Sequence, residues 1–132
     1  MRIKGKIVFS GIIEGQLVVS KKAISFLGGV DVETGVIRER GHPLEGIGLK
    51  GKILLLPRGK GSTVGSYTLY QMKKNGVAPS GIFSVQGDEM VASGAIISEI
   101  PMLYEPRGEL LNIPCGKRAI LNAKEGYLEV QD

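Results

Sequence analysis

The central apolar segment of the chain is residues 53–56, Ile-Leu-Leu-Leu. A strand with one face in water alternates apolar and polar residues, so this uninterrupted aliphatic run predicts a strand buried on both faces. Pro57 follows at once. Because proline has no backbone N–H and keeps the residue before it extended, we expect the strand to end at Leu56. The strand therefore leads directly into residues 58–66.

Residues 58–66, Arg-Gly-Lys-Gly-Ser-Thr-Val-Gly-Ser, combine glycines, cations and hydroxyl groups. A helix is predicted next, over residues 67–75, because two lysines and an Asn-Gly pair mark its C-terminal end. Thr63 and Ser66 are the candidates for its N-cap. Glycine lets the backbone adopt positive φ and approach a ligand, and the free N–H groups at a helix start attract anions. The pattern therefore predicts an anion-binding turn between a buried strand and a helix.

Short apolar runs on both sides of this segment predict a chain rich in strands. Further strands are expected at residues 3–9, 14–19, 82–85, 118–122 and 127–130, the last two as a hairpin. Residues 88–95 are predicted to form a helical turn with Asp88 as its N-cap, whereas residues 21–27 fit a helical turn or a strand edge equally well. The whole pattern predicts a single α/β domain over residues 1–132, β-rich and with one well-defined helix.

The amino-acid composition argues against several classes of protein. Glycine makes up 20 of the 132 residues, about twice its usual share, which many short strands joined by tight turns would explain. The net charge of +4 is spread thinly and there is no tryptophan, so we do not expect a nucleic-acid surface. The sequence has neither an apolar run that could span a bilayer nor the apolar core of a signal peptide, which predicts a cytoplasmic chain without membrane contact.

The single cysteine limits the redox and metal chemistry that this chain can carry out alone. Cys115 has no second cysteine with which to form an intramolecular disulfide. It also cannot hold a zinc ion or an iron–sulfur cluster by itself, because such sites need several cysteine or histidine ligands. The sequence therefore predicts no metal or cofactor site within this chain.

Residues 58–66 allow three interpretations. The simplest is a strand–helix turn whose glycines serve geometry alone. A nucleotide-binding P-loop is excluded, because Lys60 is followed by glycine instead of serine or threonine, and the first glycine of the motif would fall at Leu54. The third interpretation makes Ser62 a reactive hydroxyl. Arg58 and Lys60 would supply the positive charge that a serine base needs, and the helix start would supply oriented dipoles.

A Ser-His-Asp triad is a weaker hypothesis for the same serine. His42 is the only histidine, and Val64 stands where the nucleophile elbow Gly-x-Ser-x-Gly needs its second glycine. His42 itself fits either a loop residue with a satisfied hydrogen bond or a substrate or interface contact. Tyr67 and Tyr70, at helical spacing, are expected to be core or subunit contacts.

Three sequence blocks, in this order, resemble the small subunit of the aconitase X group. They are His-Pro-Leu-Glu-Gly at residues 42–46, Leu-Pro-Arg-Gly-Lys-Gly-Ser-Thr-Val-Gly-Ser at residues 56–66, and Asn-Gly-Val-Ala-Pro at residues 75–79. The resemblance covers essentially the whole chain. It implies a swivelling β/β/α domain that is the counterpart of the mobile domain of aconitases. It also implies a large partner subunit, which carries a 4Fe-4S cluster.

The resemblance further implies a hydro-lyase that is active only with its large subunit. The expected reaction is loss of water from (R)-mevalonate 5-phosphate to give trans-anhydromevalonate 5-phosphate, in the archaeal mevalonate pathway to isoprenoid precursors. By the family pattern Ser62 is the proton acceptor, and the cluster iron of the large subunit is the Lewis acid that binds the leaving hydroxyl. The expected substrate-binding residues are Arg58, Gly59, Lys60, Gly61 and Thr63.

Alternatives remain at this stage. The substrate could be hydroxyproline, since a hydroxyproline dehydratase belongs to the same group. The chain could also be a non-catalytic β-rich domain that binds an anion or a partner through the same loop. Arg58 and Lys60 could bind a substrate carboxylate or phosphate, or could simply face solvent.

Overall fold

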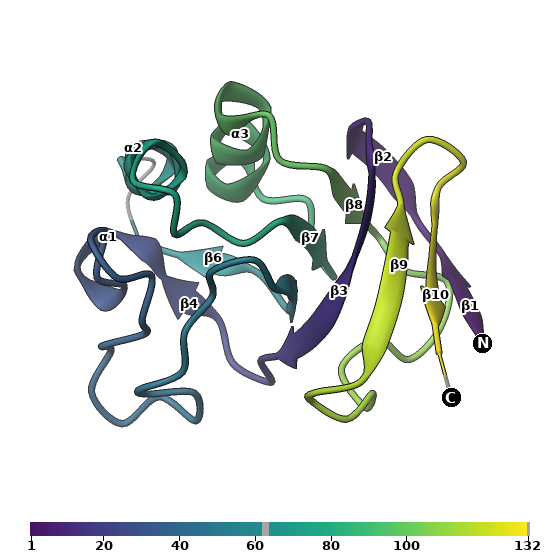
Figure 1. Cartoon of the computed structure of the whole chain (residues 1–132), viewed down its shortest axis with the longest axis horizontal. Helices are drawn as coiled ribbons and strands as arrows, with labels where there is room; N and C mark the ends of the chain where they lie inside the picture. Colours follow the sequence, from purple (N-terminus) through teal and green to yellow (C-terminus); the bar gives the residue numbers. More distant parts are fainter. Residues whose placement is uncertain (62–63, 132) are drawn as a thin grey trace.

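The computed structural model of the chain describes residues 1–61 and 64–131. The strands are β1 Arg2–Lys4, β2 Lys6–Phe9, β3 Ile12–Val19, β4 Ile24–Ser25, β5 Ile53–Leu56, β6 Gly59–Lys60, β7 Gly81–Ser84, β8 Met102–Tyr104, β9 Arg118–Asn122 and β10 Tyr127–Val130. The helices are α1 Phe26–Gly29, α2 Gly65–Lys74 and α3 Glu89–Ser98. Figure 1 shows α2 and α3 together on one side of a curved sheet. The predicted α/β, β-rich class is confirmed.

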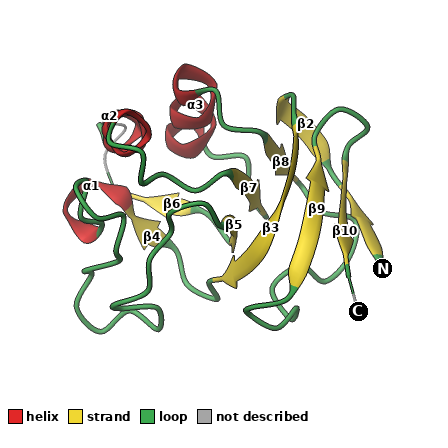
Figure 2. Ribbon diagram, viewed as in Figure 1, coloured by secondary structure: helices red, strands yellow, loops and turns green. Residues whose placement is uncertain are grey.

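The main sheet has the strand order β1-β10-β9-β3-β5-β7-β8-β2. Strands β3, β5, β7 and β8 run parallel to one another, and the remaining pairs are antiparallel. Strands β1 and β2 are separated only by Gly5, yet they stand at the two ends of this order, so the sheet curves back on itself (Figure 2). A Cβ at Gly5 would lie 2.6 Å from Cζ of Phe83, so a larger residue cannot occupy this crossing without displacing the ring.

Strand β5 lies between two separate hydrophobic cores, as its sequence predicts. Leu54 and Leu56 pack into a core shared with α2 and α3, whereas Ile53 and Leu55 pack into the core enclosed by the curved sheet. All four side chains are fully buried. The first core includes Leu69 of α2, together with residues of α3. The order of layers is therefore sheet, sheet and helices, which is the expected β/β/α architecture.

Helix α2 confirms the predicted helix, although it begins two residues before the predicted start at residue 67. Its C-terminal end is as predicted, with Asn75 as the C-cap and Gly76 at a positive φ of 73°. Ser66 lies inside the first turn and Val64 occupies the N-cap position, so the prediction of Ser66 as the cap was wrong. Thr63, the other candidate for the cap, lies outside the described residues.

Helix α3 begins as predicted but extends further along the chain. The Asp88 carboxylate accepts a hydrogen bond from Val91 N at 3.0 Å, which confirms the N-cap. The helix then continues to Ser98, three residues beyond the end of the predicted turn at Ala95. Gly94 lets α3 pack closely on α2, because a Cβ there would lie 2.7 Å from Cδ1 of Leu69. Within the described residues, no helix is both long and apolar enough to cross a membrane.

The ambiguous segment at residues 21–27 forms the short strand β4 and the beginning of α1. The predicted C-terminal hairpin is confirmed, with Tyr127 opposite Asn122 and Val130 opposite Ala119. The predicted first strand is divided into β1 and β2 at the Gly5 crossing. These short elements flank the parallel strands. The candidate site lies at the carboxyl ends of those strands.

The position of β5 between two cores gives a prediction about stability. Leu54→Ala and Leu55→Ala should each lower the free energy of unfolding by about 2–5 kcal/mol, because each leaves a cavity in a different core. Ile97→Ala is the control, since this side chain is 45% exposed, and its effect should stay below about 1 kcal/mol. Denaturant unfolding measures all three. A cost below about 1 kcal/mol for either leucine would contradict burial of both faces.

Candidate active site

The carboxyl ends of the parallel strands meet at one edge of the sheet, which is where open α/β sheets usually bind ligands. Residues 57–61 leave β5 at this edge, beside Ser20 after β3 and Gln86 after β7. Ser20 N donates to Leu55 O at 2.8 Å, and Gln86 N donates to Pro57 O at 2.9 Å. The predicted loop therefore begins between two neighbouring chain segments that are hydrogen-bonded to its strand.

The first half of the glycine-rich loop after β5, residues 58–61, is not an unpaired turn. Residues Gly59 and Lys60 form strand β6, which pairs in parallel with Ile24 and Ser25 of β4. Ile24 N also donates to Arg58 O at 3.2 Å. The segment that the sequence left ambiguous is thus a strand that holds the first half of the loop.

Lys60 is fixed by a carboxylate from a distant loop. Its Nζ lies 2.5 Å from Oε2 of Glu39, and the other carboxylate oxygen of Glu39 accepts a hydrogen bond from Ser25 N at 3.0 Å. Burial raises the pKa of the Glu39 carboxyl, but the hydrogen bonds from Lys60 and Ser25 outweigh it, so the pKa lies below its ordinary value. Glu39 therefore holds the lysine ammonium and the strand β4 together as a charged group.

Arg58 and Gly61 lie on the exposed surface of the loop. Arg58 donates from Nη1 to the carbonyl oxygen of Gly59 at 3.1 Å, and no ion pair of Arg58 is found within residues 1–61 and 64–131. Gly61 has a φ of 97°, which side chains rarely adopt, so the glycine is needed for the turn. Because the guanidinium has five N–H groups, donors remain with which it can bind an anion.

Gly59 differs from the other predicted substrate-binding residues. It is buried, and its N–H donates to Oδ2 of Asp88 at 3.1 Å. This N–H is therefore already occupied in the described conformation. Ser62, the predicted proton acceptor, and Thr63 lie outside the described residues.

Sequence reasoning missed Ser25 and Glu39, which hold the loop. It also missed the second contact of Asp88, whose Oδ2 accepts a hydrogen bond from Gly59 N. Glu39 precedes Lys60 by 21 positions and belongs to no motif with it, so no spacing signal could have found the pair. For Asp88, the sequence indicated only the role of helix N-cap. Its contact with Gly59 depends on how α3 packs, and residue order does not show that.

His42 is buried, and both of its ring nitrogens are hydrogen-bonded. Nδ1 accepts from Leu44 N at 3.0 Å, so Nε2 carries the proton and donates to Ala23 O at 3.2 Å. This agrees with the simpler of its two interpretations, a loop residue with satisfied hydrogen bonds. Tyr67 and Tyr70 are 67% and 40% exposed, which excludes the core and leaves subunit contact as the prediction for both.

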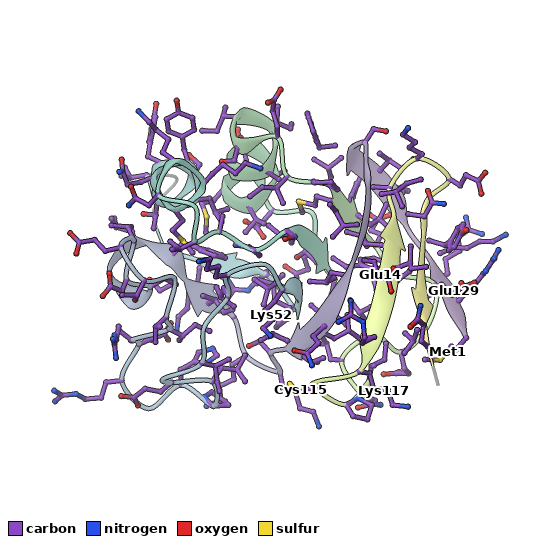
Figure 3. All side chains as sticks on the ribbon, in the orientation of Figure 1. Met1, Glu14, Lys52, Cys115, Lys117 and Glu129 are labelled. Carbon is purple, nitrogen blue, oxygen red and sulfur yellow. The ribbon has the colours of Figure 1, made fainter. Side chains whose placement is uncertain are left out.

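Two surface hollows lie away from the loop. One, of about 280 Å³, is lined by Ile113 and Val130 among others, together with Met1 and Lys117, which are labelled in Figure 3. The other, of about 260 Å³, has Lys50 in its lining and lies between the start of β5 and the end of α2. Neither is lined by Arg58 or residues 59–61, the predicted site residues that the structure describes.

The residues that the structure describes contain no group of three or more His, Cys, Asp or Glu side chains suited to a metal ion. Cys115 is exposed, and its Sγ accepts a hydrogen bond from Val19 N at 3.1 Å. This donor set does not fit an iron–sulfur cluster, which is held by several cysteine thiolates. No step of the proposed chemistry is therefore assigned to a cluster bound by these residues.

Comparison with known proteins identifies the family. The model of the family described as "Aconitase X swivel domain" matches residues 2–130. The crystal structure of Thermococcus kodakaraensis aconitase X in its holo-form superposes with a TM-score of 0.95 at 42% identity, covering 100% of this chain and 99% of that one. The solution NMR structure of a UPF0107 protein gives 0.90 at 40% identity, with full coverage of both chains. The chain belongs to the aconitase X swivel-domain family.

Relatives with curated names point to one kind of subunit. A protein of Thermococcus gammatolerans, named phosphomevalonate dehydratase small subunit, is 48% identical over 100% of this chain and 99% of its own length. Proteins with the same name from Methanosarcina acetivorans and Methanocella arvoryzae are 44% and 54% identical. They cover 98% and 78% of this chain, and 91% and 78% of their own lengths.

The Glu39–Lys60 pair gives a prediction with a defined pH dependence. Because the pKa of Glu39 is lowered on folding, its contribution to stability is present above about pH 4.3 and is lost as the pH falls through the folded-state pKa. Glu39→Gln should therefore lower the free energy of unfolding by about 1 kcal/mol at neutral pH. The difference from wild type should shrink towards zero in acid.

Denaturant unfolding between neutral pH and about pH 3 measures this dependence. Glu14→Gln is the matched control, since Glu14 lies 3.9 Å from Arg118 and both side chains are 54% exposed. It should change little at any pH. A difference for Glu39→Gln that stays constant, or grows, as the pH falls would contradict the charged role of Glu39.

Proposed function

We propose that this chain is the small subunit of a hydro-lyase that removes water from (R)-mevalonate 5-phosphate, giving trans-anhydromevalonate 5-phosphate for isoprenoid synthesis. The observation that carries the proposal is the match, over the whole chain, to relatives named phosphomevalonate dehydratase small subunit. The site geometry supports the same chemistry, because the loop after β5 gathers cations at the ligand-binding edge of the sheet.

Removal of a proton next to a carboxylate needs a base and a positive environment for the developing enolate-like charge. We assign the base to Ser62, which lies between the Arg58–Gly61 segment and the start of α2. The exposed Arg58 and Lys60 supply positive charge, and the first N–H groups of α2 supply oriented dipoles. These groups lower the cost of forming an alkoxide at Ser62.

Lys60 can serve a substrate while it stays bound to Glu39. An ammonium has three N–H donors, and Glu39 takes one of them. The remaining donors, together with the guanidinium of Arg58 and the backbone of Gly61, form the proposed binding surface for the substrate carboxylate or phosphate. Thr63 joins this surface in the proposal as a hydroxyl donor.

The large subunit completes the site in this proposal. We place the 4Fe-4S cluster there, where its iron would bind the leaving hydroxyl as a Lewis acid. Val64 and Tyr67, which flank the loop at the start of α2, are 49% and 67% exposed. Tyrosine is enriched at subunit interfaces, so this face of α2 is suited to be covered by the partner.

The test is co-expression with the large subunit, anaerobic cluster loading and assay of (R)-mevalonate 5-phosphate dehydration. Ser62→Ala should lower kcat by about 10²–10⁴-fold, the usual contribution of a general base. Ser98→Ala is the matched control: among the described residues its buried Oγ has no hydrogen-bond partner, so activity should be unchanged. The isolated small chain should fold but show no dehydration.

Each result has a distinct meaning for the proposal. Activity on hydroxyproline but not on the phosphate ester would refute the substrate and favour the related hydroxyproline dehydratase. Near-normal dehydration by Ser62→Ala would refute the assigned base. Binding of the partner without dehydration of either compound would favour a non-catalytic anion- or partner-binding domain.

A further inference from the structure

One carboxylate joins the proposed catalytic loop to the first turn of α3. Asp88 caps α3 through Oδ1, which accepts from Val91 N at 3.0 Å. Its other oxygen, Oδ2, accepts from Gly59 N at 3.1 Å, across 29 positions of sequence. Capping a helix needs only one side-chain oxygen. The second hydrogen bond therefore serves the loop and not the helix.

Packing ties both ends of the loop to the same turn of α3. A Cβ at Gly59 would lie 2.4 Å from Cε of Met90 and 2.6 Å from Cγ2 of Val91. A Cβ at Gly65, the first residue of α2, would lie 3.1 Å from Sδ of Met90. Met90 is itself buried. Gly59 and Gly65, on either side of the loop, therefore both pack against the first turn of α3.

We infer that the first turn of α3 is the platform that positions the catalytic loop, with Asp88 and Met90 as its positioning residues. The inference rests on the proposed function, in which the platform positions the loop so that Ser62 meets the substrate. Neither residue touches the substrate. A misplacement of about 1 Å can cost a catalytic group about 10²-fold, so a restraint of this kind has a measurable effect.

Asp88→Asn separates the two roles of the carboxylate. Asparagine caps helices about as well as aspartate, so α3 keeps its start. Its side chain has one acceptor oxygen, and the amide NH₂ then faces the N–H of Gly59, donor against donor. Asp88→Ser is the second variant, since serine also caps well but offers only one oxygen in place of two. Both variants should release the loop while leaving the helix intact.

The experiment uses the assembled complex with the large subunit and its cluster. In both variants kcat should fall about tenfold or more, with KM changed less than about threefold, because the base is misplaced and the binding groups remain. Ile100→Val is the matched control. It lies beyond the opposite end of α3 and should leave kcat unchanged.

Amide hydrogen exchange provides a readout that does not depend on activity. Peptides covering residues 58–66 should exchange about tenfold faster in Asp88→Asn than in wild type, whereas peptides covering the first turn of α3 should not change. Unchanged loop exchange, or faster exchange with normal kcat, would overturn the positioning role. A wild-type complex that dehydrates neither candidate substrate would instead refute the proposed function, and the exchange result would still show whether Asp88 anchors the loop.

Discussion

The structure depends on a strand that has no face in water. Because successive residues of β5 enter two different cores, the strand must lie in the interior of the sheet with parallel neighbours on both sides. Pro57 ends it at the sheet edge where the neighbouring parallel strands also end. The position of the glycine-rich loop is thus set by core packing before any of its own residues contribute.

Three segments far from the loop in sequence then restrain it. Strand β4 pairs with its backbone, Glu39 binds its lysine, and the first turn of α3 supports its glycines. The backbone is held through hydrogen bonds and close packing, while the cations and the turn at Gly61 stay on the surface. This division suits a loop whose anchored backbone leaves its cations accessible to a substrate and a large partner.

Local sequence signals were enough for much of the fold. The aliphatic run predicted β5, and the Asp88 cap predicted the start of α3, because each depends on neighbouring residues alone. The end of α3 could not be predicted in this way, because Ile96 and Ile97 are β-branched residues typical of strands, yet they continue the helix to Ser98. The contact of Glu39 with the loop arises from tertiary folding, and the role of Ser62 came from the family resemblance.

The central claim is that the loop after β5 presents Ser62 to a substrate held between the two subunits. A crystal structure of the complete complex with the dehydrated product bound would test it most directly. The account predicts Ser62 Oγ within about 3–3.5 Å of the carbon that has lost its proton, with Arg58 and Lys60 beside the carboxylate or phosphate. A product bound with this loop turned towards solvent, and another side chain at that carbon, would contradict it.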